Sequence, residues 1–197
     1  TLVQSLSEGA DPLHKVSIIP RGPMGGATFS LPEKDRTHYT RKYCMAFMQV
    51  CLGGRVAEEA VFQDVSSGAS SDIMQATGMA KAMVMNWGMS EKLGPINFGD
   101  PSGRDLMYGM NMEKEYSDTT AEMIDSEIKA FTNEALNNAR DIVGKNREKL
   151  EAIAQALLKY ETLDAEEVKA LLAGKELDKP TVGDLLAAEQ QKSSSSQ

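Results

Sequence analysis

Helical spacing of apolar residues, sustained from residue 40 almost to residue 172, is the feature that most constrains the fold of this chain. Apolar side chains recur every three or four residues, which places them on one face of an α-helix. Residues 94–108 are rich in Gly, Pro and Asp and predict a loop. The chain is therefore expected to be mainly α, an array of packed helices. The helices are predicted over residues 40–62, 70–89, 117–143 and 146–160, with a short one capped by Asp164 and ending before Gly174.

A shorter pattern near the N-terminus predicts β-structure. Residues 1–8 carry Leu and Val at helical spacing and predict the end of a short helix. The β-branched run at residues 15–21 and the alternating residues 27–31 predict two strands, with a turn at residues 23–26 between them. The two strands together predict one small β-ribbon.

Two features of the predicted helices bear on how they pack. Gly53 and Gly54 interrupt the first helix. Each glycine costs a helix interior about 1 kcal/mol, which suggests a compensating reason such as a closely packed neighbouring helix. The next helix is rich in methionine, whose flexible side chain fills irregular gaps, so these residues are expected to form an adaptable core. They are Met74, Met79, Met83, Met85 and Met89.

Length, charge and cysteine usage exclude several classes of protein. A chain of 197 residues holds one domain with a proper core, or one domain plus a tail. The net charge of −8 argues against nucleic acid as the main partner. No apolar run approaches the ~20 residues of a membrane-spanning helix. Cys44 and Cys51 share a predicted helix with their Cα atoms about 10 Å apart, too far for a disulfide. We expect buried free thiols in a reducing compartment.

The chain divides into a helical domain and a C-terminal extension. We expect the domain over residues 1–174 and the extension over residues 175–197. From about residue 190 the extension is rich in Ser and Gln and is predicted to be disordered. The first residue is Thr1 and no signal-peptide pattern follows it, which suggests a processed or truncated piece.

The stretch from residue 66 to residue 77 is the strongest candidate for a functional site. It reads Ser-Ser-Gly-Ala-Ser-Ser-Asp-Ile-Met-Gln-Ala-Thr, so a loop of small residues turns into a helix with Asp72 near its start. An acid at a helix start is commonplace, because the helix dipole favours it by about 0.3–1 kcal/mol. A zinc peptidase needs three protein ligands and an open position for water. Asp72 alone therefore cannot hold the metal.

The two histidines do not complete such a site. His14 and His38 lie far apart in the sequence, each beside a predicted strand or turn. A His-Glu-x-x-His helix places two imidazoles on one metal, with the glutamate as general base, but no such motif occurs in the 197 residues. We expect both histidines to be surface or capping residues.

Five motifs, in order and with close spacing, resemble hallmarks of the FtsH family of membrane-anchored, ATP-dependent metalloproteases. The resemblance runs from about residue 1 to residue 173. Any one motif is a weak signal, but five in register identify the chain as similar to the family's C-terminal peptidase domain. The motifs are residues 14–22, 52–59 (Leu-Gly-Gly-Arg-Val-Ala-Glu-Glu), 67–72 (Ser-Gly-Ala-Ser-Ser-Asp), 87–95 (Trp-Gly-Met-Ser-Glu-Lys-Leu-Gly-Pro) and 160–164 (Tyr-Glu-Thr-Leu-Asp).

The resemblance assigns a role to Asp72. In the family, a His-Glu-x-x-His motif supplies two zinc ligands and the catalytic base, and the aspartate of the small-residue loop supplies the third ligand. That aspartate matches Asp72, and the His-Glu-x-x-His motif is expected just before Thr1. By this resemblance the chain as printed lacks two ligands and the general base, holds no complete catalytic set, and is expected to be inactive alone.

The resemblance also points to residues beyond the ligand. The position of Glu58 permits it to orient a zinc ligand or the loop that bears it, although Glu58 and Glu59 are equally read as a solvated residue and a buried partner of Arg55. Ile18 and Ile19 resemble the family's edge strand, which receives an extended substrate by strand addition. An ordinary ribbon packed on helices is an equally good interpretation of these two residues.

For the parent protein, the resemblance implies a membrane-anchored hexamer that degrades unfolded or membrane proteins. An ATPase module outside this chain would use ATP and magnesium, and the peptidase domain would face the cytoplasm, the mitochondrial matrix or the chloroplast stroma. Two alternatives stay open. One is a pseudo-protease that acts as a scaffold or adaptor for an ATPase. The other is a helical interaction module with no proteolytic ancestry, which the five ordered motifs disfavour.

Overall fold

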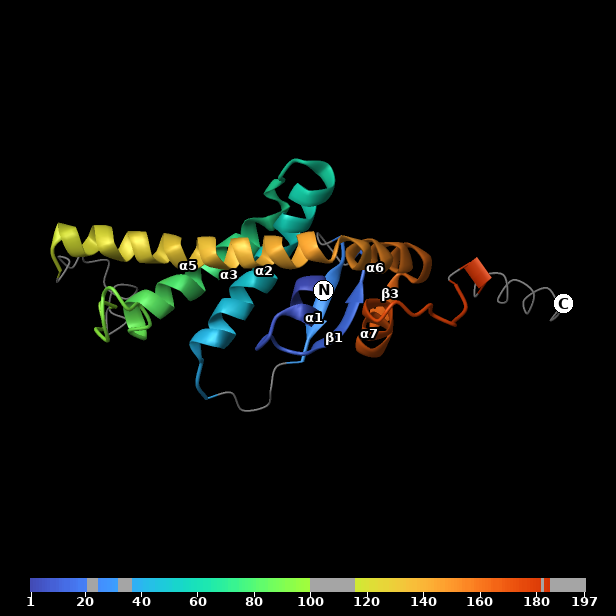
Figure 1. Ribbon diagram of the computed structural model, residues 1–197, viewed down its shortest axis with the longest axis horizontal. Coiled ribbons are helices and arrows are strands. Elements are labelled where there is room, and N and C mark those ends of the chain that lie inside the picture. The colour runs from blue at the N-terminus through green and yellow to red at the C-terminus, as the bar shows by residue number, and fades with distance from the viewer. Residues whose placement is uncertain (21–24, 32–36, 100–115, 182, 185–197) are drawn as a thin grey trace. The chain divides into compact units, whose positions relative to one another are not determined.

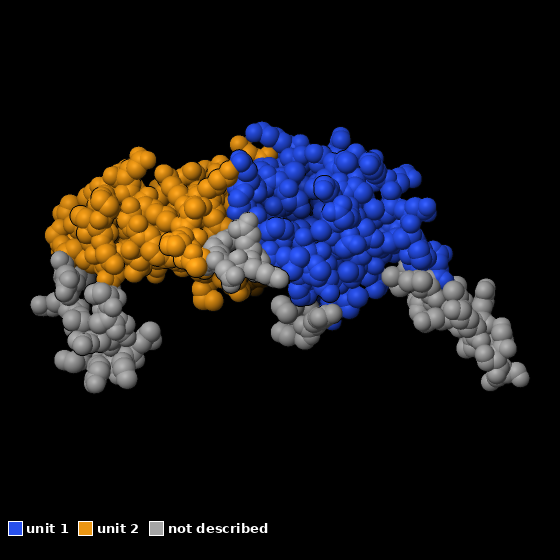
Figure 2. All heavy atoms as spheres, turned by 90° about the horizontal axis from the view of Figure 1, so that it is seen from below, with its two compact units in different colours: residues 1–36, 142–197 blue, residues 37–141 orange. Residues whose placement is uncertain are grey.

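The computed structural model describes residues 1–20, 25–31, 37–99, 116–181 and 183–184 (Figure 1). The chain forms two compact units, residues 1–36 with 142–197 (unit 1) and residues 37–141 (unit 2) (Figure 2). Within the described residues, none of the helices combines the length and the apolar character needed to span a bilayer. The predicted disorder from residue 190, and parts of the predicted turn at 23–26 and loop at 94–108, fall outside the described residues.

Unit 1 combines short helices with a small antiparallel sheet. The sheet has the order β2-β1-β3, and β1 pairs antiparallel with both neighbours. Val16 in the middle of β1 is opposite Thr28 of β2 and Leu163 of β3, and the side chains of Val16 and Leu163 are buried. The elements of unit 1 are α1 (Leu2–Leu6), β1 (Leu13–Ser17), β2 (Ala27–Ser30), α6 (Arg147–Tyr160), β3 (Thr162–Asp164) and α7 (Ala165–Leu172).

The prediction of a mainly α chain is confirmed, but the β-ribbon has a third strand that the sequence pattern did not reveal. Strand β3 follows α6 after Glu161, whose left-handed backbone (φ 59°) ends the helix and reverses the chain. The predicted strand at residues 15–21 is also wrong in extent, because β1 ends at Ser17. With β2 on one side and β3 on the other, β1 is the central strand and not an edge.

Helix α7 begins where its sequence predicts. The Asp164 carboxylate accepts from the backbone N–H of Glu167, and the Glu167 carboxylate accepts from the backbone N–H of Asp164, both at 2.9 Å. This reciprocal capping box satisfies two amides that the first turn leaves without helical partners.

The described residues of unit 2 form three α-helices and two short helical turns. Thr40 caps α2 by accepting from the backbone N–H of Tyr43, as the predicted start at residue 40 requires. Residues 118–141 of α5 belong to this unit. The elements are α2 (Arg41–Phe62), the 3₁₀ turn η1 (Ser67–Ala69), α3 (Ser70–Lys81), the π-helical turn η2 (Ala82–Asn86) and α5 (Asp118–Lys145).

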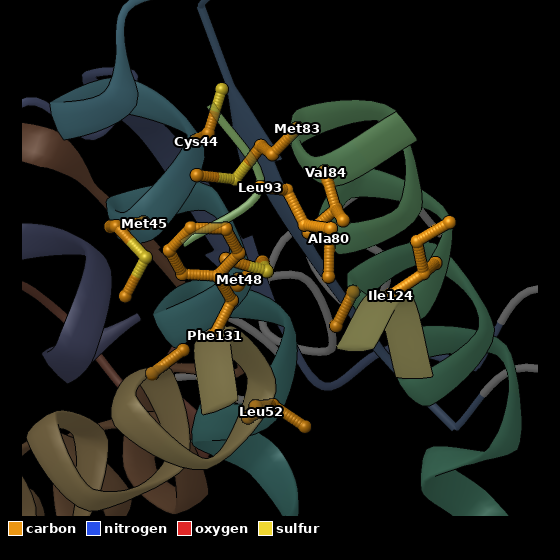
Figure 3. Close-up of a cluster of buried hydrophobic side chains, with 12 residues drawn as sticks. Cys44, Met45, Met48, Leu52, Ala80, Met83, Val84, Leu93, Ile124 and Phe131 are labelled. Carbon is orange, nitrogen blue, oxygen red and sulfur yellow. The ribbon is translucent and has the colours of Figure 1, made fainter. Parts of the chain in front are cut away.

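The core of unit 2 lies between these helices. Figure 3 shows side chains from α2, from α3 with η2 and from α5 gathered into one cluster, with Met48 and Met83 fully buried. Met79, Met85 and Met89 pack against it, which confirms the prediction of a methionine-rich core. Met74 is the exception, because 69% of its surface is exposed. Burying a Met or Phe side chain stabilises a fold by about 1.5–3 kcal/mol, so this cluster dominates the stability of unit 2.

The helix predicted over residues 70–89 ends earlier, at Asn86, and its last turn is π-helical. The wider turn leaves carbonyls free for partners outside the helix. The carbonyl of Met83 accepts from the N–H of Met89, and that of Met85 accepts from the N–H groups of Phe98 and Gly99. The π-turn therefore ties the following segment back onto α3.

The glycine pair in α2 predicted a closely packed neighbouring helix, and this prediction is wrong at Gly54. A Cβ built there meets no atom of the described residues within 4 Å. Gly54→Ala is therefore expected to stabilise the chain by about 0.5–1 kcal/mol, because alanine lowers the entropy of the unfolded chain without a clash. Urea unfolding of the variant measures the gain.

Gly88→Ala is the matched control in the same unit. Gly88 has a φ of +58°, and a Cβ there would lie 2.8 Å from the Cα of Pro95. This variant should lose at least about 1 kcal/mol. A Gly54→Ala chain that is less stable than the parent would show that α2 has a close neighbour at that position.

A buried charge holds the segment after η2 to α5. The carboxylate of Glu127, only 7% exposed, accepts from the Ser90 hydroxyl and from the Lys92 ammonium, both at 2.7 Å. The hydrogen bond from Lys92 is the main reason that the pKa of Glu127 lies below its usual 4.5, and it outweighs the opposing effect of burial. The motif at residues 87–95 was visible in the sequence, but its partner Glu127 on α5 was not.

Glu127→Gln is expected to cost about 1–3 kcal/mol at neutral pH, because it removes a charge-assisted hydrogen bond from a buried site. The pKa of Glu127 is lower in the folded chain than in the unfolded chain, so its contribution is complete above the unfolded value of about 4.5 and is lost as the pH falls through the folded value. Unfolding in urea at pH 7 and at successively lower pH should show the difference between parent and variant shrinking. The exposed Glu122→Gln variant on the same helix should change stability by less than about 0.5 kcal/mol throughout. A Glu127→Gln penalty that stays constant in acid would contradict this account.

Candidate metal-binding loop

The loop that carries Asp72 is anchored to the end of α2 by Glu58. The Glu58 carboxylate accepts from the backbone N–H of Ser66 at 3.2 Å and from the Ser66 hydroxyl at 3.1 Å. The Ser66 oxygen in turn accepts from the backbone N–H of Gly68 at 3.1 Å and caps the turn η1. One carboxylate and one hydroxyl thereby link α2 to η1, and α3 follows η1 directly.

Asp72 lies in the first turn of α3, directly after this anchored turn. Its side chain is half-buried, and burial raises the pKa of its carboxyl. Cys51, on the neighbouring helix α2, is close enough to feel the Asp72 charge. Burial, with that charge second, raises the pKa of Cys51 to about 12, so the thiol stays protonated at neutral pH. Cys44 is fully buried and Cys51 is half-buried, and both are free thiols as predicted.

The described residues do not by themselves fit a zinc ion. A structural or catalytic zinc takes at least three protein ligands. Across the described part of the chain, no three His, Cys, Asp or Glu side chains gather closely enough to hold a metal. His14 lies in β1 of unit 1 and His38 precedes α2 in unit 2, both exposed, and His38 Nδ1 lies 2.7 Å from the hydroxyl of Thr37. Asp72 is thus a single carboxylate donor on an anchored loop.

The structure separates the two adjacent glutamates. Glu58 contacts the loop, which was one of the two interpretations of this residue. Glu59 accepts from the Arg140 guanidinium of α5 at 3.0 Å, so Arg140 takes the place predicted for Arg55. The cap residue Ser66 is visible in the sequence, but its contact with Glu58 requires the chain to close between α2 and α3.

The residues predicted to receive substrate belong to unit 1. Ile18 and Ile19 follow the central strand β1 and are not part of it. The backbone N–H of Ile18 donates to the carbonyl of Glu161, so it continues the pairing toward β3 by one hydrogen bond. Ile19 is about half exposed, and its N–H donates to the Ser17 hydroxyl. Their role in receiving an extended substrate stays a prediction.

The described structure thus offers a helical array and an anchored loop followed by one carboxylate at a helix start, and carboxylates can serve as zinc ligands in metallohydrolases. Comparison with known proteins supplies the family. The chain belongs to peptidase family M41, whose model matches residues 1–171.

Curated proteins that are similar to this chain indicate the same family. The chain is 44% identical over 177 residues to an ATP-dependent zinc metalloprotease FtsH of Myxococcus xanthus, covering 89% of this chain and 28% of the relative. It is 46% identical over 174 residues to the protein of the same name from Bacillus subtilis, covering 87% of this chain and 27% of the relative. The resemblance to the FtsH family is thereby confirmed, and the family is one of zinc metalloproteases. The chain spans little more than a quarter of the length of these relatives.

Glu58→Ala tests the anchor. Without the carboxylate, the N–H and hydroxyl of Ser66 lose their acceptor, and the net loss of about 1 kcal/mol in local stability should accelerate amide exchange at residues 66–68 roughly fivefold. Hydrogen–deuterium exchange with mass spectrometry measures this. The neighbouring Glu59→Ala variant loses the Arg140 contact instead and should leave the loop amides unchanged. Equal exchange in both variants would show that Glu58 does not hold the loop.

Proposed function

We propose that this chain is the peptidase domain of a membrane-anchored, ATP-dependent zinc endopeptidase. The observation that carries the proposal is the loop fixed by Glu58, which presents Asp72 at the start of α3 within a chain that family M41 matches over residues 1–171. Asp72 supplies one zinc ligand, and a His-Glu-x-x-His segment located before Thr1 in the longer protein supplies two more and the general base. The chain alone is then inactive. A zinc ion held by Asp72 and the two histidines would supply Lewis-acid polarisation of a peptide carbonyl and activation of a water molecule.

In this proposal, the residues of this chain position the metal ligand and do not transfer protons. The raised pKa of Asp72 reflects partial removal from water, so a cation at that position would recover the lost solvation of the carboxylate. Glu58 holds the loop so that Asp72 does not have to be ordered when the metal arrives, which lowers the entropic cost of binding.

The parent protein is proposed to be a hexamer. An ATPase module, with ATP and magnesium, would unfold membrane or misfolded proteins and deliver them to the peptidase domain. This domain would lie on the cytoplasmic, matrix or stromal side of the membrane. The names of the relatives, each an ATP-dependent zinc metalloprotease, support the ATP and zinc assignments.

Asp72→Asn in the longer protein tests the ligand assignment. Bound zinc per chain and peptide cleavage are both measured. Loss of a direct ligand should weaken zinc binding by more than the roughly 10–100-fold typical of residues that only orient ligands, and cleavage should fall with it. Asp118→Asn, which also removes an acid from the first turn of a helix, is the matched control and should retain zinc and activity.

Two results would overturn the proposal. Full zinc occupancy and cleavage in the Asp72→Asn variant would remove Asp72 from the site. A gene sequence without a His-Glu-x-x-His motif upstream of Thr1 would instead favour the pseudo-protease scaffold.

A further inference from the structure

A buried polar side chain on α1 has no role in the site described so far. Gln4 is only 4% exposed, although glutamine belongs to the residue types that mostly lie at the surface. Its neighbours Leu2 and Val3 are equally buried, so apolar contact already holds α1 within unit 1. Apolar contact has no preferred direction, and it does not explain why an amide occupies this position.

The amide nitrogen of Gln4 makes two directional contacts. It donates to the carbonyl of Asp11 at 2.9 Å and to the hydroxyl oxygen of Ser30 at 2.8 Å. Asp11 lies in the connection between α1 and β1, and Ser30 is the last residue of β2. One turn earlier on α1, the hydroxyl of Thr1 lies 3.0 Å from that of Thr28 on the same strand. The side chain of Gln4 thus joins α1 to the entry of β1 and to β2 at once.

The orientation of this amide is forced, and it leaves its oxygen without a partner. A backbone carbonyl can only accept, so the nitrogen of Gln4 must face Asp11. The oxygen Oε1 is buried and has no hydrogen-bond partner among the described residues. An unpaired buried acceptor costs at least as much as a typical hydrogen bond contributes. The cost of the oxygen therefore offsets the two bonds of the nitrogen, and Gln4 is not expected to stabilise unit 1 more than an apolar side chain of similar size.

A residue that fixes direction without adding stability has a geometric effect. Hydrogen bonds weaken steeply when their distance and angle change, so the two bonds of Gln4 resist sliding or rotation of α1 against the sheet. The part of the longer protein before Thr1 is joined covalently to α1, about one helical turn from Gln4. The placement of α1 therefore sets the point from which that part begins.

We propose that Gln4 is a positioning residue of the zinc site, because its amide fixes α1 to Asp11 and Ser30 and thereby the start of the segment that bears the two zinc-binding histidines. This proposal rests on the proposed function. Gln4 acts through α1 and not on the metal or the substrate. Each half of the site then has its own anchor, Gln4 on the side of the histidines and Glu58 on the side of Asp72.

Gln4→Leu in this chain tests the anchor in the absence of metal. The urea midpoint of unfolding should stay close to that of the parent, because the unpaired oxygen is lost together with the two bonds. The amide of Leu31 donates to the carbonyl of Pro12, next to Asp11, and its hydrogen exchange should become roughly fivefold faster. Val3→Ala is the matched control on the same helix. It removes buried apolar volume and should lower the midpoint more than Gln4→Leu does.

The same variants in the longer protein separate position from stability. Gln4→Leu should weaken zinc binding and lower kcat about tenfold with KM little changed, as for residues that orient metal ligands. Val3→Ala should affect zinc binding less, although it is the less stable variant. Ser30→Ala keeps the bond to Asp11 and should have an effect between that of Gln4→Leu and that of the parent.

The results that contradict this proposal differ from those that contradict the proposed function. A large loss of stability in Gln4→Leu, or a larger loss of zinc from Val3→Ala, would show that Gln4 is an ordinary structural residue. Full zinc binding by Gln4→Leu, in a longer protein that loses zinc on Asp72→Asn substitution, would refute the positioning role alone. A longer protein that binds no zinc before any substitution would overturn both.

Discussion

The apolar contact of α2 with α3 and α5 is the constraint on which unit 2 depends. Met48 and Met83 are fully buried between these helices, and residues 63–69 are the whole connection between α2 and α3. Such a short connection leaves the loop little freedom once the helices pack, so the core fixes where the loop begins and ends. The Glu58 carboxylate then removes the remaining freedom at Ser66. The position of Asp72 is thus a consequence of apolar packing first and of hydrogen bonding second.

The surroundings of Asp72 determine the ionisation of its carboxyl group and of a neighbouring thiol. Burial raises the pKa of Asp72, and the same carboxylate acts on the Cys51 thiol of α2. Partial burial makes the charged form of Asp72 less favourable than it is in water, and a bound cation would offset that cost. Glu59 differs, because its carboxylate is paired with Arg140. The two adjacent glutamates therefore have different partners: Glu58 contacts the loop and Glu59 contacts α5.

Helix starts with local signals were predictable from sequence, whereas features that depend on distant partners were not. Thr40 and Asp164 cap their helices where the pattern placed them. Strand β3 has only three residues, too few to show an alternating pattern. It forms because it pairs with β1, whose Ser17 is 145 positions from Thr162 in the chain. That pairing makes β1 the central strand of the sheet, which the sequence pattern did not reveal. From the residue pattern alone, Asp72 was only a common first-turn acid. Its role as a zinc ligand was predicted from the family resemblance. Its anchor at Ser66 requires the folded loop.

The first part of the C-terminal extension is also fixed by a series of contacts along the chain. The family match ends at residue 171, yet Lys179 contacts Glu167, Thr162 and Tyr160 in one place. Each contact stabilises the chain only slightly because Lys179 is partly exposed, but together they fix the chain at this residue. The cost of closing a loop depends on the length of free chain, so every fixed point lowers the cost of the next contact. The cap between Thr181 and Asp184 is the next such point.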